Sequence, residues 1–235
     1  MQICFCGKLS DNERFSIFVT SIWGRLINYL NSKHTAMHWL YETLKTKTVG
    51  IAGCGGLGSN CAMALARVGV GRLIIADFDV VSDSNLNRQY FFRDQIGKLK
   101  VYALKENLQR VNPEVKVNAF DLRLCSNDIV EIFSDCDVIV EAFDLSKMKQ
   151  MIIETVLMYM PEKYIVSGVG LAGWGENNML ATRFYDKLII CGDGEIEVSE
   201  DLPPIAPRVG IVAHMQANQV LEILLGKMPY KKSQE

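Results

Sequence analysis

The stretch Thr48–Asn60 (TVGIAGCGGLGSN) constrains the fold most, because an apolar run leads directly into a glycine-rich turn. Gly53, Gly55 and Gly58 follow the G-x-G-x-x-G spacing of turns that bind dinucleotides. Without a Cβ the backbone can turn tightly and approach a phosphate, and the following helix directs free N–H groups towards it. The stretch therefore predicts a strand–turn–helix unit that binds a nucleotide, although it does not decide between a nicotinamide cofactor and another nucleotide.

Downstream of this turn, short apolar runs alternate with segments of helical periodicity, which is the pattern of βαβ units. The expected strands are Val49–Ala52, Leu73–Ala76, Val115–Phe120, Val138–Ala142 and Tyr164–Val169. The expected helices cover residues 57–68, 101–111, 127–133, 146–160 and about 210–225. Near the C-terminus, Met179–Phe184 and Lys187–Cys191 are expected to form an antiparallel hairpin that turns at Tyr185-Asp186. These patterns predict an α/β fold: a Rossmann-like, mostly parallel sheet with helices on both faces, a C-terminal antiparallel hairpin and a final helix.

Composition and charge limit the domain organisation, the partners and the cellular location that we expect. Residues 1–47 do not follow the alternation, so we expect a small helical appendage there and one nucleotide-binding domain over 48–235. The formal net charge of −2 gives no positive field for nucleic acid or an acidic membrane. No apolar stretch approaches the roughly 20 residues of a membrane span, and no secretory signal pattern is present, so we expect a cytoplasmic protein. The seven cysteines form no C-x-x-C pair, which favours reduced thiols and argues against structural zinc.

A polar excursion follows the second predicted strand. Asp77 ends that strand 19 residues after Gly58, where an acidic side chain can accept hydrogen bonds from ribose hydroxyls. The stretch Asp77–Phe91 (DFDVVSDSNLNRQYF) then continues as a polar segment where a simple dehydrogenase would usually enter its next helix. It carries donors and acceptors suited to a nucleotide: Asp79, Asn85, Asn87, Arg88 and Gln89. The excursion favours a nucleotide site other than that of a simple dehydrogenase.

Three charged residues are candidates for contacts with phosphate groups. Arg88 is of the type that clamps phosphate oxygens in a forked geometry, and Lys100, at the start of a helix, is a point charge that could reach a triphosphate. Asp144 follows the strand Val138–Ala142 at the carboxyl edge of the sheet, where a carboxylate can hold Mg²⁺ between itself and phosphate oxygens. Taken singly, a solvated loop, a surface lysine and a helix N-cap explain them equally well. Their joint placement around one crevice favours phosphate binding.

Four strings of residues together resemble the ThiF/MoeB/HesA family, bacterial relatives of the ubiquitin-activating enzymes. They are GCGGLGS (Gly53–Ser59), DFDVVSDSNLNRQ (Asp77–Gln89), Gly97 with Lys100, and EAFD (Glu141–Asp144). The likeness covers most of residues 45–226 and is nearest to the short ThiF form. That branch is indicated by EAFD, which stands where relatives more often have D-x-x-D-N, and by three further strings: KHT (Lys33–Thr35), CGDG (Cys191–Gly194) and APRVGIVAHMQAN (Ala206–Asn218).

The resemblance implies an adenylyltransferase. Members of the family bind ATP with Mg²⁺ and transfer its adenylyl group to the C-terminal glycine carboxylate of a small β-grasp carrier protein, with release of pyrophosphate. For the ThiF form the carrier would be a ThiS-like sulfur carrier that ends in Gly-Gly and serves thiamine thiazole synthesis. Expected partners also include a second copy of the chain and a downstream cysteine desulfurase or sulfurtransferase. The residues implied for ATP are Gly53, Gly55, Gly56, Gly58, Asp77, Asp79, Asn85, Arg88, Gln89 and Lys100.

Within that site the resemblance also implies roles. Asp77 would hold the ribose, and Arg88 and Lys100 would contact the phosphates together with Asn85. Asp144 would hold Mg²⁺, so the implied catalytic residues are Arg88, Lys100 and Asp144. The implied transfer needs positioning and neutralisation of developing charge rather than a protein nucleophile.

The sequence also departs from the family. Many relatives carry two C-x-x-C pairs for zinc, whereas only Cys191 stands near that position here, so we expect no zinc site. No cysteine lies in Ser199–Arg208, where some ThiF enzymes have a reactive one, and this puts a covalent carrier–enzyme intermediate in doubt. Relatives lend an N-terminal arginine across a dimer to the partner's ATP, and here Arg25 or Lys33 could serve.

Two further features concern the extended tail of a carrier protein. Gly168–Gly173 (GVGLAG) follows a predicted strand and is expected to admit a narrow glycine tail. His214, on the last helix, could face the same channel or belong to a polar contact between subunits.

Other functions remain open. One is activation of a different carrier, such as a molybdopterin-type one, or of another carboxylate. A nicotinamide-dependent oxidoreductase is disfavoured, because no proton-relay constellation is evident and the polar residues form a phosphate clamp. A binding module that has kept the fold and lost activity is the third alternative. The presence of Arg88, Lys100 and Asp144 together argues against it.

Overall fold

The computed structural model describes residues 37–196 and 198–226. The chain divides into two compact units, residues 1–42 and 43–235, and the described part of the first unit, 37–42, is helical. The candidates Arg25 and Lys33 and most of the expected N-terminal appendage lie outside the described residues. Within the described ranges, no helix combines the length and the apolar character needed to cross a membrane.

Seven strands of the described chain form one sheet in the order β3-β2-β1-β4-β5-β7-β6. They are β1 (Thr48–Ala52), β2 (Arg72–Asp77), β3 (Lys116–Asp121), β4 (Val138–Glu141), β5 (Tyr164–Val169), β6 (Ala181–Tyr185) and β7 (Leu188–Gly192). All neighbours are parallel except β6, which pairs antiparallel with β7. Because β1 lies between β2 and β4, the chain reverses its direction of winding there, and the carboxyl ends of β1 and β4 form a topological switch point.

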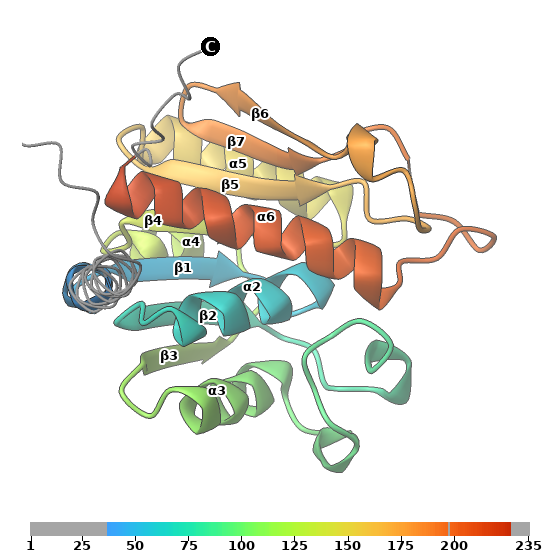
Figure 1. Cartoon of the computed structure of the whole chain (residues 1–235), viewed down its shortest axis with the longest axis horizontal. Helices are drawn as coiled ribbons and strands as arrows, with labels where there is room; N and C mark the ends of the chain where they lie inside the picture. Colours follow the sequence, from blue (N-terminus) through green and yellow to red (C-terminus); the bar gives the residue numbers. More distant parts are fainter. Residues whose placement is uncertain (1–36, 197, 227–235) are drawn as a thin grey trace, which may run out of the picture. The chain divides into compact units, whose positions relative to one another are not determined.

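Helices cover both faces of the sheet. The described helices of the second unit are α2 (Gly56–Arg67), α3 (Lys100–Val111), α4 (Ser126–Phe133), α5 (Ser146–Tyr159) and α6 (Ala206–Leu225). Helices α2, α3 and α6 lie on the near face of the sheet in Figure 1, and α4 and α5 lie behind it. Sequence-local signals set their ends: α2 is followed by Gly69, which has φ +93, and α3 stops before Asn112-Pro113. The predicted α/β class, with its hairpin and final helix, is confirmed.

Most boundaries differ from the sequence-based expectation by one or two residues, and two of the differences have a local cause. Helix α6 begins at Ala206, one turn earlier than the expected start near Gly210, because Pro207 fits the first turn of a helix, where its missing N–H has no intrahelical partner. The hairpin pairs Tyr185 with Leu188, so its turn is Asp186-Lys187 rather than Tyr185-Asp186. Asp186 adopts φ +53, a left-handed conformation that Asp tolerates better than bulkier residues.

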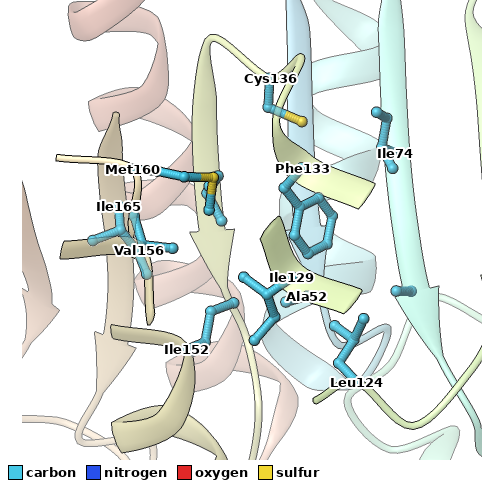
Figure 2. Close-up of a cluster of buried hydrophobic side chains, with 12 residues drawn as sticks. Ala52, Ile74, Leu124, Ile129, Phe133, Cys136, Ile152, Val156, Met160 and Ile165 are labelled. Atoms are coloured by element: carbon cyan, nitrogen blue, oxygen red, sulfur yellow. The ribbon is translucent and has the colours of Figure 1, made fainter. Parts of the chain in front are cut away.

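An apolar cluster fills the space between the sheet and the rear helices. Figure 2 shows Ile129 and Phe133 of α4 beside Ile152 and Val156 of α5, facing the sheet. The sheet makes room for the Phe133 ring at Gly50 of β1, where an added Cβ would lie 2.6 Å from Phe133 Cδ1. The glycine in this buried strand is therefore a packing requirement, and it allows α4 to lie close to β1.

Phe133 is expected to be a major source of stability, since its side chain is fully buried in this cluster. Phe133→Ala should lower the free energy of unfolding in urea by about 3–5 kcal/mol, which combines the lost transfer energy and the cavity left behind. Met158, also in the rear layer but 68% exposed, supplies the control: Met158→Ala should change stability by less than about 0.5 kcal/mol. Equal losses in the two variants would contradict the packing argument.

Candidate nucleotide-binding site

The glycine turn joins β1 to α2 at the switch point. Gly53 has φ +98, and a Cβ there would lie 2.7 Å from the carbonyl oxygen of Ala142, just past β4. A Cβ at Gly58 would lie 1.8 Å from the carbonyl oxygen of Gly53, so helix and turn touch through their backbones. At Gly55, by contrast, Gln89 Nε2 is the one described atom within 4 Å of an added Cβ, at the ordinary contact distance of 3.8 Å. Gly53 and Gly58 thus allow close packing, while Gly55 leaves the N-terminus of α2 uncrowded.

Asp77, at the end of β2, is tied to this turn. Its Oδ2 accepts a hydrogen bond of 2.6 Å from the backbone N–H of Cys54, and its Oδ1 accepts one of 2.8 Å from Asp79. A carboxylate oxygen has two lone pairs, so both oxygens can still accept a bond from a ribose hydroxyl. The carboxylate lies where the sequence placed it, and it also holds the turn in shape.

The polar excursion after β2 is docked onto α2. Asn60 Nδ2 donates to the carbonyl oxygens of Gly56 and Arg88, at 2.7 and 2.9 Å, and the N–H of Tyr90 donates to Ser59 Oγ at 3.0 Å. Sequence reasoning missed these two anchors. The available signal was the Ser-Asn pair that directly follows the glycine motif, one helical turn from the ligand space. Through these bonds the first turns of α2 fix the segment that carries Arg88 and Gln89.

Arg88 and Gln89 lie beside the glycine turn. The Arg88 side chain passes Gly56, where a Cβ would be 3.6 Å from its Cγ, and its guanidinium donates to Ser84 O at 3.1 Å and to Asn87 Oδ1 at 2.7 Å. Gln89 is buried, and its Oε1 has no hydrogen-bond partner within the described chain. A buried unpaired acceptor costs about 1–3 kcal/mol. A ligand that brings a hydrogen-bond donor to Gln89 Oε1 would relieve that cost, so this position suits a polar ligand.

Lys100 begins α3 and pairs with Asp79. The distance from its Nζ to Asp79 Oδ2 is 2.8 Å, and its side chain is only 7% exposed. The Lys100 charge acts on the Cys54 thiol in the glycine turn, where it opposes the rise in that pKa, so the ammonium lies near the turn. Asn85 lies in the intervening segment, and its Oδ1 accepts a bond from Ser82 N that closes a short 3₁₀ helix, Asp83–Asn85.

Asp144 is exposed just past β4, and a buried network shapes the segment before it. The fully buried Glu141 accepts bonds at Oε1 from Phe143 N, at 2.7 Å, and at Oε2 from Ser167 Oγ, at 2.6 Å. Lys149 of α5 completes the network with an ion pair to Glu141 at 2.8 Å and a bond to Gly168 O at 2.9 Å. Glu141 was noted only as part of EAFD, and Lys149 was missed. Together they fix the backbone that carries Asp144 towards the sheet edge.

A second buried ion pair joins two of the strings noted in the sequence. Arg208 of APRV and Asp193 of CGDG are each at most 2% exposed, and Arg208 Nη2 donates to Asp193 Oδ2. Burial opposes ionisation of Asp193, but the N–H groups of Glu195 and Ile196 and the Arg208 guanidinium outweigh it, so the pKa of this carboxyl lies below its ordinary value. Sequence reasoning did not find this pair, because nothing local relates the two positions.

The remaining candidates are Cys54, Cys191, His214 and Gly168. Burial raises the pKa of the Cys54 thiol, and it raises that of Cys191 to about 11, so neither is poised as a thiolate. In residues 37–196 and 198–226, no group of three or more His, Cys, Asp or Glu side chains is arranged to hold a metal. His214 is exposed, with Nδ1 2.7 Å from Gly210 O, and lines a groove along α6. Gly168 packs on Leu57 and Gln216.

The geometry defines a class of protein: an α/β domain of the Rossmann type with a candidate nucleotide site at the switch point of its sheet. The glycine turn, the acid that ends β2 and the docked segment that carries Arg88 lie at the same carboxyl edge. A family model described as the ThiF family matches residues 30–234, and the chain belongs to that family. This confirms the resemblance at the level of the family.

Among curated relatives, the chain is 28% identical over 198 residues to the adenylyltransferase and sulfurtransferase UBA4 of Scheffersomyces stipitis, which covers 78% of this chain and 42% of that protein. It is 27% identical over 191 residues to the molybdopterin-synthase adenylyltransferase of Escherichia coli K12, covering 79% and 76%. It thus spans less than half the length of the first relative. A solved structure of E. coli TcdA, a tRNA N6-threonylcarbamoyladenosine dehydratase, in complex with ATP shares the fold with TM-score 0.71 and 19% identity, covering 79% of this chain and 88% of that one.

Proposed function

We propose that the protein adenylylates the C-terminal glycine carboxylate of a ThiS-like sulfur carrier, using ATP and releasing pyrophosphate. The observation that carries the proposal is the docked excursion. The N–H of Tyr90 donates to Ser59, and Asn60 donates to the carbonyl oxygen of Arg88. These bonds hold Arg88 and Gln89, whose Oε1 is unpaired within the described chain, beside the glycine turn. Arg88 and Lys100 supply cationic groups for phosphate oxygens, which favours phosphoryl chemistry over hydride transfer.

The chain's residues would act by position and charge. Asp77 would accept from the ribose, and the N-terminus of α2 would direct N–H groups towards the phosphates. The carrier carboxylate would attack the α-phosphorus, and the bond from that phosphorus to the bridging oxygen of pyrophosphate would break. Arg88 and Lys100 would neutralise the charge that develops on the leaving group. No protein nucleophile is required, which agrees with the raised pKa values of the Cys54 and Cys191 thiols.

Asp144 fits a role in holding Mg²⁺. It is an exposed carboxylate at the sheet edge, and its backbone is anchored through Phe143 and Glu141. Mg²⁺ is usually bound through one or two carboxylates together with substrate phosphates, and it would neutralise phosphate charge there. Asp144 lies three residues after the end of β4, which pairs with β1, the strand that leads into the glycine turn. We do not expect a zinc site.

The choice of carrier is the finer part of the proposal. The strings EAFD, CGDG and APRV favour a ThiS-like carrier ending in Gly-Gly. The curated relatives named for molybdopterin synthase and UBA4 keep other small β-grasp carriers as the alternative. We also propose that the protein acts in the cytoplasm as a homodimer, upstream of a cysteine desulfurase or sulfurtransferase, and that Arg25 or Lys33 reaches the partner's ATP.

Carrier-dependent ATP–pyrophosphate exchange tests the proposal. The purified protein should incorporate labelled pyrophosphate into ATP only when a ThiS-type carrier is present. The same carrier lacking its terminal glycine is the matched control, because it removes the acceptor carboxylate from its place. A molybdopterin-type carrier in a parallel reaction separates the two branches. Failure with every carrier ending in Gly-Gly would refute carrier adenylylation, and tight NADH binding without ATP binding would favour the oxidoreductase.

A further inference from the structure

The loop after β5 displays a tryptophan to solvent. Trp174 is 71% exposed and lies between Gly173 and Gly175, which have φ +69 and φ +74. Tryptophan has a large, rigid apolar surface with a polar N–H, which suits it to contacts with a partner. Tryptophan is also enriched among the few residues that dominate the affinity of protein–protein interfaces. The side chain at this position therefore marks a contact surface.

The backbone around Trp174 is firmly held. Arg208, itself buried, donates to Gly170 O at 3.4 Å and to Gly175 O at 2.6 Å, on the two sides of the tryptophan. Gly173 N donates to Pro203 O at 3.2 Å, and Ala172 forms an isolated bridge with Pro204. These hydrogen bonds fix the backbone of the loop that carries the indole. Because that backbone is already ordered, binding of a partner loses less conformational entropy, which favours Trp174 as a binding anchor.

The exposed charges in the segments next to Trp174 are acidic, while the nearby Arg208 is buried. The segment 198–204 lies against the tryptophan loop, since a Cβ at Gly173 would lie 3.0 Å from Leu202 Cδ1. The sequence from 192 to 207 contains no lysine or arginine. Its acids and the neighbouring loop supply four exposed carboxylates: Glu176, Glu195, Glu200 and Asp201. An exposed indole with an acidic rim complements a partner that has an apolar centre and basic residues around it.

The loop that carries Trp174 is close enough to the glycine turn for the flexible tail of a bound partner to reach the turn. β5 is the neighbour of β4, and β4 is the neighbour of β1, so the loop leaves the sheet two strands from the glycine turn at the same edge (Figure 1). Adjacent strands are about 4.8 Å apart. An extended tail of about six residues spans about 20 Å, which is more than the separation of those strand ends. A partner seated on Trp174 could therefore place its C-terminus at the site.

We propose that Trp174 and the acidic residues Glu176, Glu195, Glu200 and Asp201 form the docking surface for the folded body of the carrier protein, through a basic and apolar patch on the carrier. This rests on the proposed function. Arg208 and Asp193 act as positioning residues for the surface. The two strings CGDG and APRV, unrelated in the sequence, then serve one purpose: they brace the loop that receives the carrier.

Trp174→Ala tests this docking surface. With the carrier that supports exchange in the wild type, the KM for carrier should rise at least 10-fold, while the Kd for ATP should change less than 2-fold. Trp174→Phe should recover most of the loss. Tyr159→Ala is the matched control, because Tyr159 is 63% exposed at the end of α5, near the opposite edge of the sheet, and this change should leave the KM for carrier unaltered.

The acidic rim is tested by charge reversal. The double variant E200K/D201K should slow association with the carrier and reverse the salt dependence of that rate, whereas Glu131→Lys, an exposed acid on α4, should do neither. Calorimetric titration of the same carrier into the protein, without ATP, measures docking apart from catalysis. Binding that needs Trp174 without exchange would refute the adenylylation alone. Exchange that is insensitive to Trp174 would refute the docking surface alone, as would a Trp174→Ala variant that changes only the oligomeric mass.

Discussion

Lys100→Ala is expected to lower the rate constant of carrier-dependent ATP–pyrophosphate exchange by about 10²–10³-fold, the effect of removing one pre-positioned group that stabilises developing charge. The Lys100 ammonium is almost fully shielded from water and is held by Asp79 at 2.8 Å near the glycine turn. Because water would screen the Lys100 ammonium only weakly from phosphate oxygens, its loss should weaken stabilisation of the transition state more than it weakens binding of ATP. The rate constant at saturating ATP is the quantity to measure.

Lys98→Ala is the matched control for Lys100. Lys98 lies two residues earlier, is half exposed and pairs with Glu106 at 3.1 Å on the surface. Its replacement should change exchange less than about 2-fold, since surface pairs contribute at most about 1 kcal/mol. If Lys100→Ala kept wild-type exchange, or if both variants lost activity alike, the assignment of Lys100 to the phosphates would be wrong. Lys100→Arg, which keeps the charge but changes its geometry, should recover only part of the rate.

The course of the chain through the sheet could be predicted because its signals are local. The strand Tyr164–Val169 is found with the predicted bounds, because helical periodicity on the N-terminal side of the apolar run limits where the strand can lie. The glycine fingerprint could also be recognised in the sequence, because close backbone contacts at the turn require glycine at Gly53 and Gly58. The early start of α6 was missed because Pro207 signals a break as readily as a first turn.

The contacts that shape the site could not be predicted, because they join residues that only the fold brings together. Glu141 meets Lys149 across the β4–α5 connection, and Asn60 holds Arg88 across 28 positions of sequence. Neither pair has a periodic or compositional signature. Sequence therefore indicated candidate side chains for the nucleotide site, whereas the bonds that orient those side chains follow from tertiary structure alone.

Arg208→Met is expected to be strongly destabilising, with a dependence on pH that identifies the cause. At about pH 7 the variant leaves the Asp193 carboxylate buried without its cation, and losses of about 3–5 kcal/mol follow when one member of a buried ion pair is removed. Methionine keeps much of the side-chain volume, so the loss reports the charge rather than a cavity. Urea unfolding at about pH 7 and about pH 4.5 measures it.

The sign of the pH dependence follows from the pKa of Asp193. In the wild type that pKa lies below its ordinary value, so the stabilisation is present above the unfolded-state pKa of about 3.9 and is lost as the pH falls through the folded-state pKa. In Arg208→Met the cation that lowers the pKa is gone, so the carboxyl takes up a proton at higher pH. The stability gap between wild type and variant should therefore narrow from about pH 7 to about pH 4.5.

Arg183→Met separates this charge effect from the loss of ordinary hydrogen bonds. Arg183 donates to the carbonyl oxygens of Gly192 and Asp193, at 3.1 and 2.9 Å, and has no carboxylate partner among the residues that the structure describes. Its removal should cost about 1 kcal/mol per bond at either pH, with a constant gap. A stability gap for Arg208→Met that stays constant or widens on acidification would show that the ion pair with Asp193 does not hold the loop that carries Trp174.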